Sequence, residues 1–427
     1  MTIKKALMTR KHRMYSKSIL ILLCPLLFAC GGKKSADSAN ADTQNGLVTF
    51  HLNAPPSKVE PLLLSELADS VSYVALETTK ESLTDRAIQC GDRYYTVIRN
   101  DEKLLCFDKN GKYLHQIGRK GKGPEEYPWM VDYDYFKVDP VTDCVYINSD
   151  SCTKVYDENG KYAKTIKGGY WRSLPELVYN HMAYFAPAYH PMIEIIDERN
   201  NQCVTNNKDF IQKNRKFWKE LNDKYRKEGF CEHEATETRY SISNDACYAW
   251  SVFYDTVMMA KGKEVKPFCL IIPENKYLPE DCYSKNVKEL LQPLIVRMYI
   301  CNNKLLLSVR YYPSFEKALA FNTKPKENIK YCYWVVCDLK DGSVTYHANN
   351  IINDLDGGPN ILLPIYNVED IYSLSVEDLK NDEEIYNSYF TEGIQAKLKD
   401  QDGKFQRLLE PLADDANPII RTYHWKK

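Results

Sequence analysis

The sequence predicts an all-β fold, and a repeated strand–turn–strand pattern is the main observation behind this prediction. Residues 104–117 read LLCFDKNGKYLHQI and residues 153–166 read TKVYDENGKYAKTI, so the pattern recurs after 49 residues. Each copy contains an alternating strand, a D-x-N-G turn and a second alternating strand, and Asn-Gly suits a tight hairpin turn. The dominant period of two argues against a helix bundle. Strands that follow turns directly argue against βαβ units.

The size of the repeated unit narrows the fold class further. Another predicted strand lies upstream of each turn, and the clearest of these strands cover residues 93–98, 144–149, 182–187 and 304–309. A unit therefore contains about four strands in about 40–50 residues, which is the size of one β-propeller blade. Roughly 380 residues follow the N-terminal segment, which accommodates about six blades. We therefore predict a six-bladed β-propeller over residues 47–427.

Residues 207–228 interrupt the strands with a helical pattern. One face of the predicted helix is apolar and the rest is charged, which is typical of a helix lying on a protein surface. The apolar residues are Ile211, Trp218, Leu221 and Tyr225. We expect a short inserted helix on a blade edge or rim, and a helix that binds a partner is the alternative. Partly helical segments are also predicted near the C-terminus, over residues 376–410.

The chain ends in a predicted strand, residues 418–425. Propellers combine strands from both termini in one blade, which removes a free sheet edge. The candidate partners for this C-terminal strand are residues 48–53 and residues 70–78.

Residues 1–29 predict a lipoprotein signal peptide. Six lysines and arginines precede a ten-residue apolar run (ILILLCPLLF), which is short of the about 20 residues that a membrane-spanning helix needs. The following Leu27-Phe28-Ala29-Cys30 resembles the bacterial lipobox, in which the cysteine is acylated and the chain is cut before it. We therefore expect an acyl anchor in membrane lipid at Cys30. A buried apolar segment with an incidental cysteine is the alternative.

The segment after this cysteine predicts a flexible tether over residues 30–46, because its residues are small and polar and offer little to bury. The expected location is the cell envelope, at the outer membrane. No strongly acidic run follows Cys30, so the periplasmic face and the cell surface both stay open.

The charge balance argues against nucleic acid as a partner. Without the six basic residues of the signal segment, 51 of the 57 lysines and arginines stand against 58 acidic residues, a net charge of −7. Nucleic-acid phosphates demand a basic surface, so we expect no nucleic-acid binding.

The cysteines give no framework for a cofactor or a metal. Apart from Cys24 and Cys30, twelve cysteines are scattered along the chain without a C-x-x-C pair. Several lie inside predicted strands, where cysteine behaves as a small apolar residue, so we expect mostly free, buried thiols. A disulfide framework is the alternative, since export permits it. Zinc ligands come in paired spacing, so we predict no metal site and no cofactor.

Several segments together resemble the six-bladed β-propeller lipoproteins of certain bacteria, a large family with little assigned function. The most specific segment is GRKGKGPEEY, in which Glu125 replaces a common glycine. The resemblance implies the fold and the lipid anchor, and it brings no catalytic residues with it. The matching segments cover residues 70–83, 103–127, 154–166, 253–274, 353–364 and 414–426.

The same glycine-rich segment is the main candidate for a ligand site. It lacks the G-x-x-x-x-G-K-[ST] spacing of a phosphate loop, and no helix follows it. We interpret it as a sharp reversal of the chain between blades, with a ligand-binding rim as the alternative. The candidate rim residues are Arg119, Glu125, Tyr127 and Trp129, and Trp171 is a further ligand-binding candidate because it lies near a predicted turn.

No catalytic residues can be assigned from the sequence. There is no G-x-S-x-G motif, and pairs of carboxylates for glycoside hydrolysis cannot be chosen among 58 acidic residues. Asp354 and Asp356 lie in an NDLDGG segment that we interpret as a turn, because it lacks the later glutamate of a calcium loop. The predicted function is binding or scaffolding for a glycan, a peptide or an envelope protein. The alternative is a hydrolase or lyase that acts on a polymer at the mouth of the propeller channel.

Overall fold

The computed structural model describes most of the chain between the first strand and the C-terminus. The predicted signal peptide, Cys30 and the predicted tether up to residue 42 lie outside the described residues, as do Trp171 and most of 376–410. The described residues are 43–44, 46–84, 87–98, 101–130, 135–149, 152–167, 174–185, 192–200, 202–205, 208–228, 231–232, 238–243, 245–251, 253–274, 283–284, 294–301, 303–311, 329–356, 358, 360–362, 373–374, 404–413 and 415–426.

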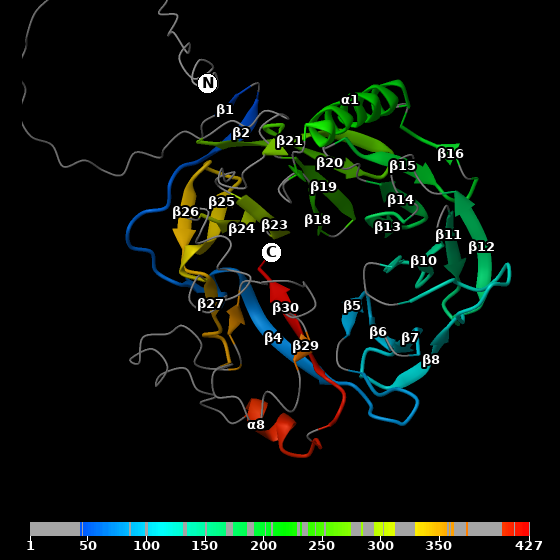
Figure 1. Ribbon diagram of the computed structural model, residues 1–427. Helices are drawn as coiled ribbons and strands as arrows, with labels where there is room; N and C mark the ends of the chain where they lie inside the picture. Colours follow the sequence, from blue (N-terminus) through cyan, green and yellow to red (C-terminus); the bar gives the residue numbers. More distant parts are fainter. Residues whose placement is uncertain are drawn as a thin grey trace, which may run out of the picture. The chain divides into compact units, whose positions relative to one another are not determined.

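The described residues are mostly β-structure, as predicted, and four sheets contain four antiparallel strands in consecutive order. In Figure 1 these strands follow one another in colour within each sheet. The strands are β5 (Ile88–Cys90), β6 (Arg93–Ile98), β7 (Lys103–Phe107) and β8 (Tyr113–Ile117); β9 (Phe136–Val138), β10 (Val145–Ser149), β11 (Cys152–Tyr156) and β12 (Tyr162–Lys167); β13 (Leu177–Tyr179), β14 (Met182–Phe185), β15 (Glu194–Asp197) and β16 (Gln202–Cys203); and β23 (Leu294–Cys301), β24 (Lys304–Arg310), β25 (Cys332–Asp338) and β26 (Val344–His347).

A fifth sheet combines four consecutive strands with two strands from the N-terminal region. Its order is β1-β2-β21-β20-β19-β18, and β2 runs parallel to β21 with Phe50 opposite Ile271. The strands are β1 (Thr43–Gln44), β2 (Leu47–Leu52), β18 (Arg239–Ser243), β19 (Ala246–Trp250), β20 (Thr256–Lys261) and β21 (Glu264–Pro273). A separate pair contains β17 (Cys231–Glu232) and β22 (Tyr283–Ser284).

Both termini contribute to the remaining sheets. The C-terminal β30 (Ile419–Trp425) pairs with β4 (Ala68–Ala75), which confirms residues 70–78 as its partner; the two strands are red and blue in Figure 1. The other candidate, residues 48–53, belongs to β2 and pairs with β21 instead. The short strands here are β3 (Leu62–Leu63), β27 (Asn350–Ile352), β28 (Ile361–Leu362) and β29 (Ser373–Leu374).

Two α-helices are described. The predicted insertion forms α1 (Lys208–Lys227), and part of the predicted C-terminal helical region forms α8 (Lys404–Leu409). No helix in the described part of the chain has both the length and the apolar composition to cross a bilayer.

The repeated D-x-N-G turns form as predicted. The Oδ1 atom of Asp108 accepts hydrogen bonds from the backbone N–H groups of Asn110 (2.8 Å) and Lys112 (2.9 Å). Asp157 does the same for the second copy, and the two turn glycines have φ of +82° and +75°. The aspartate side chain therefore closes the turn while glycine supplies the left-handed backbone.

Each of these turns also touches the segment that precedes its own sheet. The Gly111 carbonyl accepts a hydrogen bond from Glu77 N–H (2.7 Å), and the Gly160 carbonyl accepts one from Gly118 N–H (2.8 Å). A Cβ atom at Gly111 would lie 2.2 Å from the Ala75 carbonyl oxygen, and one at Gly160 would lie 2.5 Å from that of Gln116. The glycines are thus required by close packing as well as by φ.

Apolar clusters fill the spaces between successive sheets. One cluster joins β6–β8 to β9–β11, a second joins β10–β12 to β13–β15, and a third joins β13–β15 to β19 and β20. Adjacent residues of one strand serve different clusters, as Tyr94 and Tyr95 of β6 do. Both faces of these strands are therefore buried, which explains their long apolar runs.

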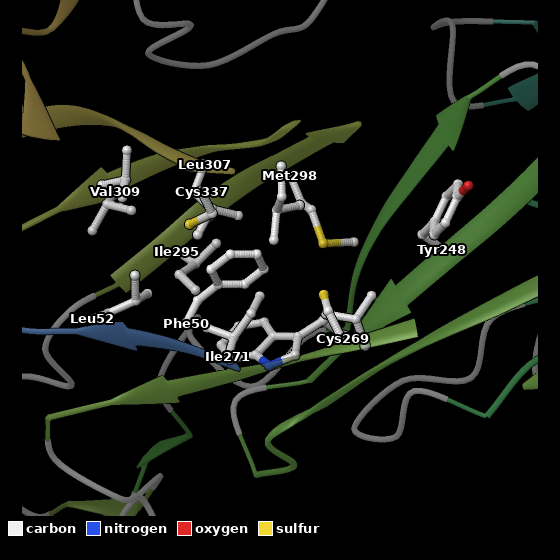
Figure 2. Packing of buried hydrophobic residues seen from close by; sticks show 14 of the residues in the cluster. Phe50, Leu52, Tyr248, Cys269, Ile271, Ile295, Met298, Leu307, Val309 and Cys337 are labelled. Carbon is white, nitrogen blue, oxygen red and sulfur yellow. The ribbon is translucent and has the colours of Figure 1, made fainter. Parts of the chain in front are cut away.

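Three more clusters complete the series. Figure 2 shows the largest, in which Phe50 of β2 and Ile271 of β21 lie close to Ile295 of β23 and Cys337 of β25. The next cluster joins β23–β25 to β4 and β27, and the last joins β30 to β6 and β7. Each of the four four-stranded sheets and the six-stranded sheet is therefore packed against two others. The ten cysteines whose state is described are free thiols, as expected, and six of them are buried.

Candidate functional site

The glycine-rich segment forms a tight loop between β8 and β9. Its backbone crosses back on itself, because Gly121 N–H donates to the Tyr127 carbonyl (2.9 Å) and Tyr127 N–H donates to the Arg119 carbonyl (3.1 Å). Glu126 N–H donates to the Gly123 carbonyl (3.1 Å). These bonds bear out the interpretation of the segment as a sharp chain reversal.

The side chain of Glu126 fills the inside of this loop. One oxygen lies 2.7 Å from Arg119 Nε, and the other accepts a hydrogen bond from Gly123 N–H (2.8 Å). The Gly123 N–H and the Arg119 guanidinium hold the pKa of Glu126 below its ordinary value. A Cβ atom at Gly121 would lie 1.8 Å from the same carboxylate, so glycine leaves the space that Glu126 occupies.

Lys154 of β11 holds the loop from the neighbouring sheet. Its ammonium donates to three loop carbonyls, those of Gly123 (3.2 Å), Pro124 (2.7 Å) and Glu126 (2.5 Å), although the residue is only 8% exposed. A buried ammonium with three acceptors is satisfied and fixes its partners in place. Tyr156 adds a fourth bond, from its hydroxyl to the Glu125 carbonyl (2.9 Å).

The sequence did not predict this clamp, although it contained a signal. The repeat offset of 49 residues aligns Lys154 with Leu105 of the first copy. Leu105 packs in an apolar cluster and is 1% exposed. A lysine at a position where the other copy has a buried leucine therefore indicated a polar contact at Lys154.

The predicted rim residues occupy different environments. Arg119 and Glu125 are exposed on the loop, and Trp129 is 36% exposed just after it. Tyr127 is fully buried: its ring packs edge-on against Tyr156, with 6.2 Å between centroids, and its hydroxyl donates to the Glu102 carbonyl (3.2 Å). Tyr127 therefore belongs to the core and not to a rim. Trp171 lies outside the described residues.

The exposed surface of the loop has the chemistry of a binding site for a polar ligand. Arg119, Lys120 and Lys122 are exposed hydrogen-bond donors, and Trp129 adds an apolar ring. Lys120 also pairs with Glu102 at 2.5 Å, which ties this part of the loop to the turn between β6 and β7. A rigid loop with donors and one indole is suited to a sugar or a peptide.

A second group of titratable side chains lies between the β9–β12 and β13–β16 sheets. The buried carboxylate of Glu198 accepts a hydrogen bond from the Tyr146 hydroxyl (2.5 Å) and lies 2.6 Å from His181 Nδ1. Burial and the nearby carboxylate raise the pKa of Tyr146, so its hydroxyl stays protonated. Lys164 Nζ lies 3.7 Å from the same carboxylate.

The backbone holds His181 in a left-handed conformation. Asn180 and His181 have φ of +47° and +65°, and both of their N–H groups donate to the buried Asp139 carboxylate (3.0 and 3.1 Å). Strained backbone of this kind needs such support to persist. A carboxylate that orients one imidazole nitrogen leaves the other available for proton transfer. The sequence analysis did not predict this group, and no local pattern marks it, because Tyr146, His181 and Glu198 come from separate segments that meet only in the folded chain.

The NDLDGG segment forms a turn, as interpreted. Asp354 accepts hydrogen bonds from Ser65 N–H (2.8 Å) and its hydroxyl (2.6 Å), and Asp356 accepts them from Asn353 Nδ2 (2.6 Å) and Gly358 N–H (3.0 Å). The two carboxylates thus bind protein donors. The described residues contain no group of three or more histidine, cysteine or carboxylate side chains arranged for a metal ion.

Comparison with known proteins gives a family and a shared fold. The model of a family described as a domain of unknown function, DUF4934, matches residues 47–424. No curated protein matches the chain. A protein from Bacteroides fragilis NCTC 9343 whose name gives it as exported has a similar crystal structure, with 13% identity and a TM-score of 0.50 over 89% of this chain and 99% of that chain. At this identity the likeness shows the fold alone.

Two further structures are less similar. A member of the DUF4221 family from Bacteroides vulgatus ATCC 8482 has 11% identity and a TM-score of 0.33, over 66% of this chain and 85% of that chain. Virginiamycin B lyase from Staphylococcus aureus has 8% identity and a TM-score of 0.32, over 67% of this chain and 76% of that chain. Neither likeness bears on function.

Proposed function

This chain belongs to the DUF4934 family, a domain of unknown function, and we propose that it is a lipid-anchored binding or scaffolding module of the cell envelope. Its ligand is a glycan, a peptide or a partner protein. The observation that carries the proposal is the loop of residues 118–130. This loop is clamped by Lys154 from the next sheet while Arg119 and Trp129 stay exposed.

The scaffold in this proposal is a six-bladed β-propeller. Six apolar clusters support it, because each joins one sheet to the next and the sixth joins β30 and β4 back to β6 and β7. In this scheme the two three-stranded sheets, β28-β27-β3 and β29-β30-β4, together make the sixth blade. Closure between the two ends of the chain is the usual way in which a propeller protects its sheet edges.

A fixed loop is the element that a binding module requires. Ordering a mobile loop on ligand binding costs conformational entropy, and a loop that is already held avoids most of this cost. Lys154 and Glu126 both act inside the loop, so neither is available to a ligand. The ligand contacts are therefore assigned to Arg119, Glu125 and Trp129.

The binding role is tested by screening the protein on glycan and peptide arrays and then measuring the affinity of each hit for two variants. Trp129→Ala is expected to weaken binding about fivefold or more, since stacking of a ligand on an aromatic ring is worth about 1–3 kcal/mol. Tyr254→Ala is the matched control, because Tyr254 is also 36% exposed but lies before β20. Equal affinity of the Trp129→Ala variant would contradict the proposed site.

The lipid anchor is tested separately in cells. Metabolic labelling with a fatty acid is expected to mark the wild-type protein and to leave the Cys30→Ser variant unlabelled. Protease treatment of intact cells then distinguishes the cell surface from the periplasmic face. A labelled Cys30→Ser variant would contradict the anchor and leave the binding role standing.

The alternative function, a hydrolase or lyase acting on a polymer, draws its support from His181. This imidazole is partly exposed, at 36% of its side chain, and it is oriented by the buried carboxylate of Glu198. Loss of polymer turnover in a His181→Asn variant that still binds the polymer would favour the enzyme over the binding module.

A further inference from the structure

Helix α1 is attached to the body of the protein by one apolar face. Trp218 and Leu221 are buried in the large cluster that also contains Phe50 and Leu52 of β2. The indole of Trp218 packs against Phe253 with 5.0 Å between ring centroids. In Figure 1 the helix is the green one labelled α1, drawn next to β20 and β21. The exposed side chains of α1 lie on the part of its surface that faces away from this cluster.

The outward surface of α1 is basic in an otherwise acidic protein. Among the side chains of the helix that the structure describes, six basic ones are exposed, against three acidic ones on it and on the residue that follows. Two of the acidic residues are already near lysines of the same helix, because Lys216 lies 3.8 Å from Glu220 and Lys219 lies 3.7 Å from Asp223. The exposed basic residues are Lys213, Lys216, Lys219, Lys224, Arg226 and Lys227.

Stabilisation of the helix itself accounts for part of this charge only. Basic side chains in the last turn interact favourably with the helix dipole, and Lys224, Arg226 and Lys227 lie there. Lys213 lies earlier and gains nothing from the C-terminal end, since the effect is confined to the last turn. Neither of the two ion pairs that the structure describes along the helix involves Lys213, so its charge needs another explanation.

An exposed aromatic ring lies within the same basic surface. Phe217 is 43% exposed, and helical spacing places it on one stripe with Lys213, four residues before it, and Lys224, seven residues after it. A basic helix face with an aromatic residue at its centre is typical of helices that lie on anionic membranes, where the ring enters the headgroup layer.

Helix α1 packs in the same apolar cluster as the strand at which the chain enters the described structure. The chain enters the described structure at β1 and β2, and β2 shares its apolar cluster with α1. The twelve residues 31–42 separate Cys30 from β1, and even fully extended they reach only about 40 Å. An acyl chain at Cys30 would therefore hold β1 within about 40 Å of the bilayer, which raises the local concentration of headgroups around the protein.

We propose that the exposed basic face of α1 binds the anionic phospholipid surface of the membrane that holds the protein. This inference rests on the anchoring part of the proposed function. Contact through α1 fixes how the body is oriented on the membrane, so that the tether and the helix together form a two-point attachment. Single lipid chains bind membranes reversibly, and a basic surface is a known kind of second signal.

The test uses the chain from residue 31 without an acyl group, because all described strands and helices lie within the compact unit Asn40–Lys427. Binding is measured by co-sedimentation with vesicles of phosphatidylcholine alone and with 30% phosphatidylglycerol, at low and high salt. We expect binding to the anionic vesicles only, with a loss of at least tenfold at high salt, because salt screens the attraction.

The decisive variant reverses three charges on the helix, Lys213→Glu, Lys224→Glu and Lys227→Glu. We expect it to lose at least tenfold in vesicle affinity. Its neutral counterpart, with glutamine at the same positions, is expected to fall between it and the wild type. The matched control reverses three exposed lysines of the two D-x-N-G turns, Lys109, Lys112 and Lys161, and is expected to bind as the wild type does.

Three results would overturn the inference: no wild-type binding to anionic vesicles, equal binding to neutral vesicles, or full binding by the helix variant. The last would indicate a protein as the partner of α1. Because the chain in this experiment carries no acyl group, its outcome is independent of the fatty-acid labelling that tests the anchor.

Discussion

The two copies of the hairpin repeat, β7–β8 and β11–β12, share their turns and differ in one buried position. Both turns are closed by an aspartate and a left-handed glycine, and both touch the preceding segment through the glycine carbonyl. At the aligned position, Leu105 packs in an apolar cluster while Lys154 binds three carbonyls of the loop 118–130. The comparison teaches that the repeat builds the scaffold, and that a departure from the repeat marks the specialised loop.

The largest effect is expected from making the first copy resemble the second. Leu105→Lys places an ammonium in an apolar cluster instead of beside the carbonyl acceptors that Lys154 has. We therefore expect a loss of about 4 kcal/mol or more in the free energy of unfolding. Denaturant unfolding measures it. The control Leu105→Met keeps the volume and is expected to cost under about 1.5 kcal/mol. A loss below about 1 kcal/mol for the lysine variant would show that the two positions are interchangeable.

The converse substitution, Lys154→Met, is expected to cost about 2–3 kcal/mol, because it leaves three partly buried carbonyls without their charged donor. It also releases the loop, which faster amide hydrogen exchange at residues 119–127 would report. Lys154→Arg is the conservative comparison, and it is expected to restore part of the protection. Unchanged exchange in the methionine variant would mean that the clamp does not hold the loop.

The D-x-N-G turn that both copies share is tested by substituting its glycine. Gly160→Ala combines a strained φ with a contact of 2.5 Å to the Gln116 carbonyl oxygen, so we expect a loss of about 2–4 kcal/mol. Gly262 is the matched control, since its φ is +57° and nothing lies within 4 Å of its would-be Cβ. Gly262→Ala therefore costs strain alone, about 1 kcal/mol. Equal losses at the two glycines would argue against the turn-to-sheet contact.

The smallest expected effect is a pH dependence inside the loop. The pKa of Glu126 is lowered in the folded protein by Gly123 N–H and Arg119. Its contribution to stability is therefore complete above its unfolded pKa of about 4.3 and is lost as the pH falls through the lower, folded value. Carboxyl-detected NMR measures this titration, and Arg119→Ala is expected to raise the pKa. An unchanged pKa of Glu126 in the Arg119→Ala variant would show that Arg119 does not stabilise this carboxylate.

Much of the scaffold followed from local sequence, and the contacts between sheets did not. The turns at Asp108 and Asp157 and the helix α1 were predicted because period and turn residues are local signals. For the C-terminal strand the sequence left two candidate partners, residues 48–53 and 70–78, and the structure shows the second. The parallel pairing of β2 with β21 was missed, since an alternating strand does not specify its neighbour. Tyr127 looked like a rim residue for a similar reason: its burial depends on Tyr156, which comes from another sheet.

The measurement that tests the central claim most directly is the affinity of an array-identified ligand for the wild type and for Lys154→Met. Lys154 is buried and contacts only the loop's carbonyls among the hydrogen bonds that the structure describes for it, so it acts through the loop. If the clamped loop is the binding surface, the folded methionine variant binds at least tenfold more weakly. Undiminished affinity in a folded variant would place the ligand elsewhere and contradict the account.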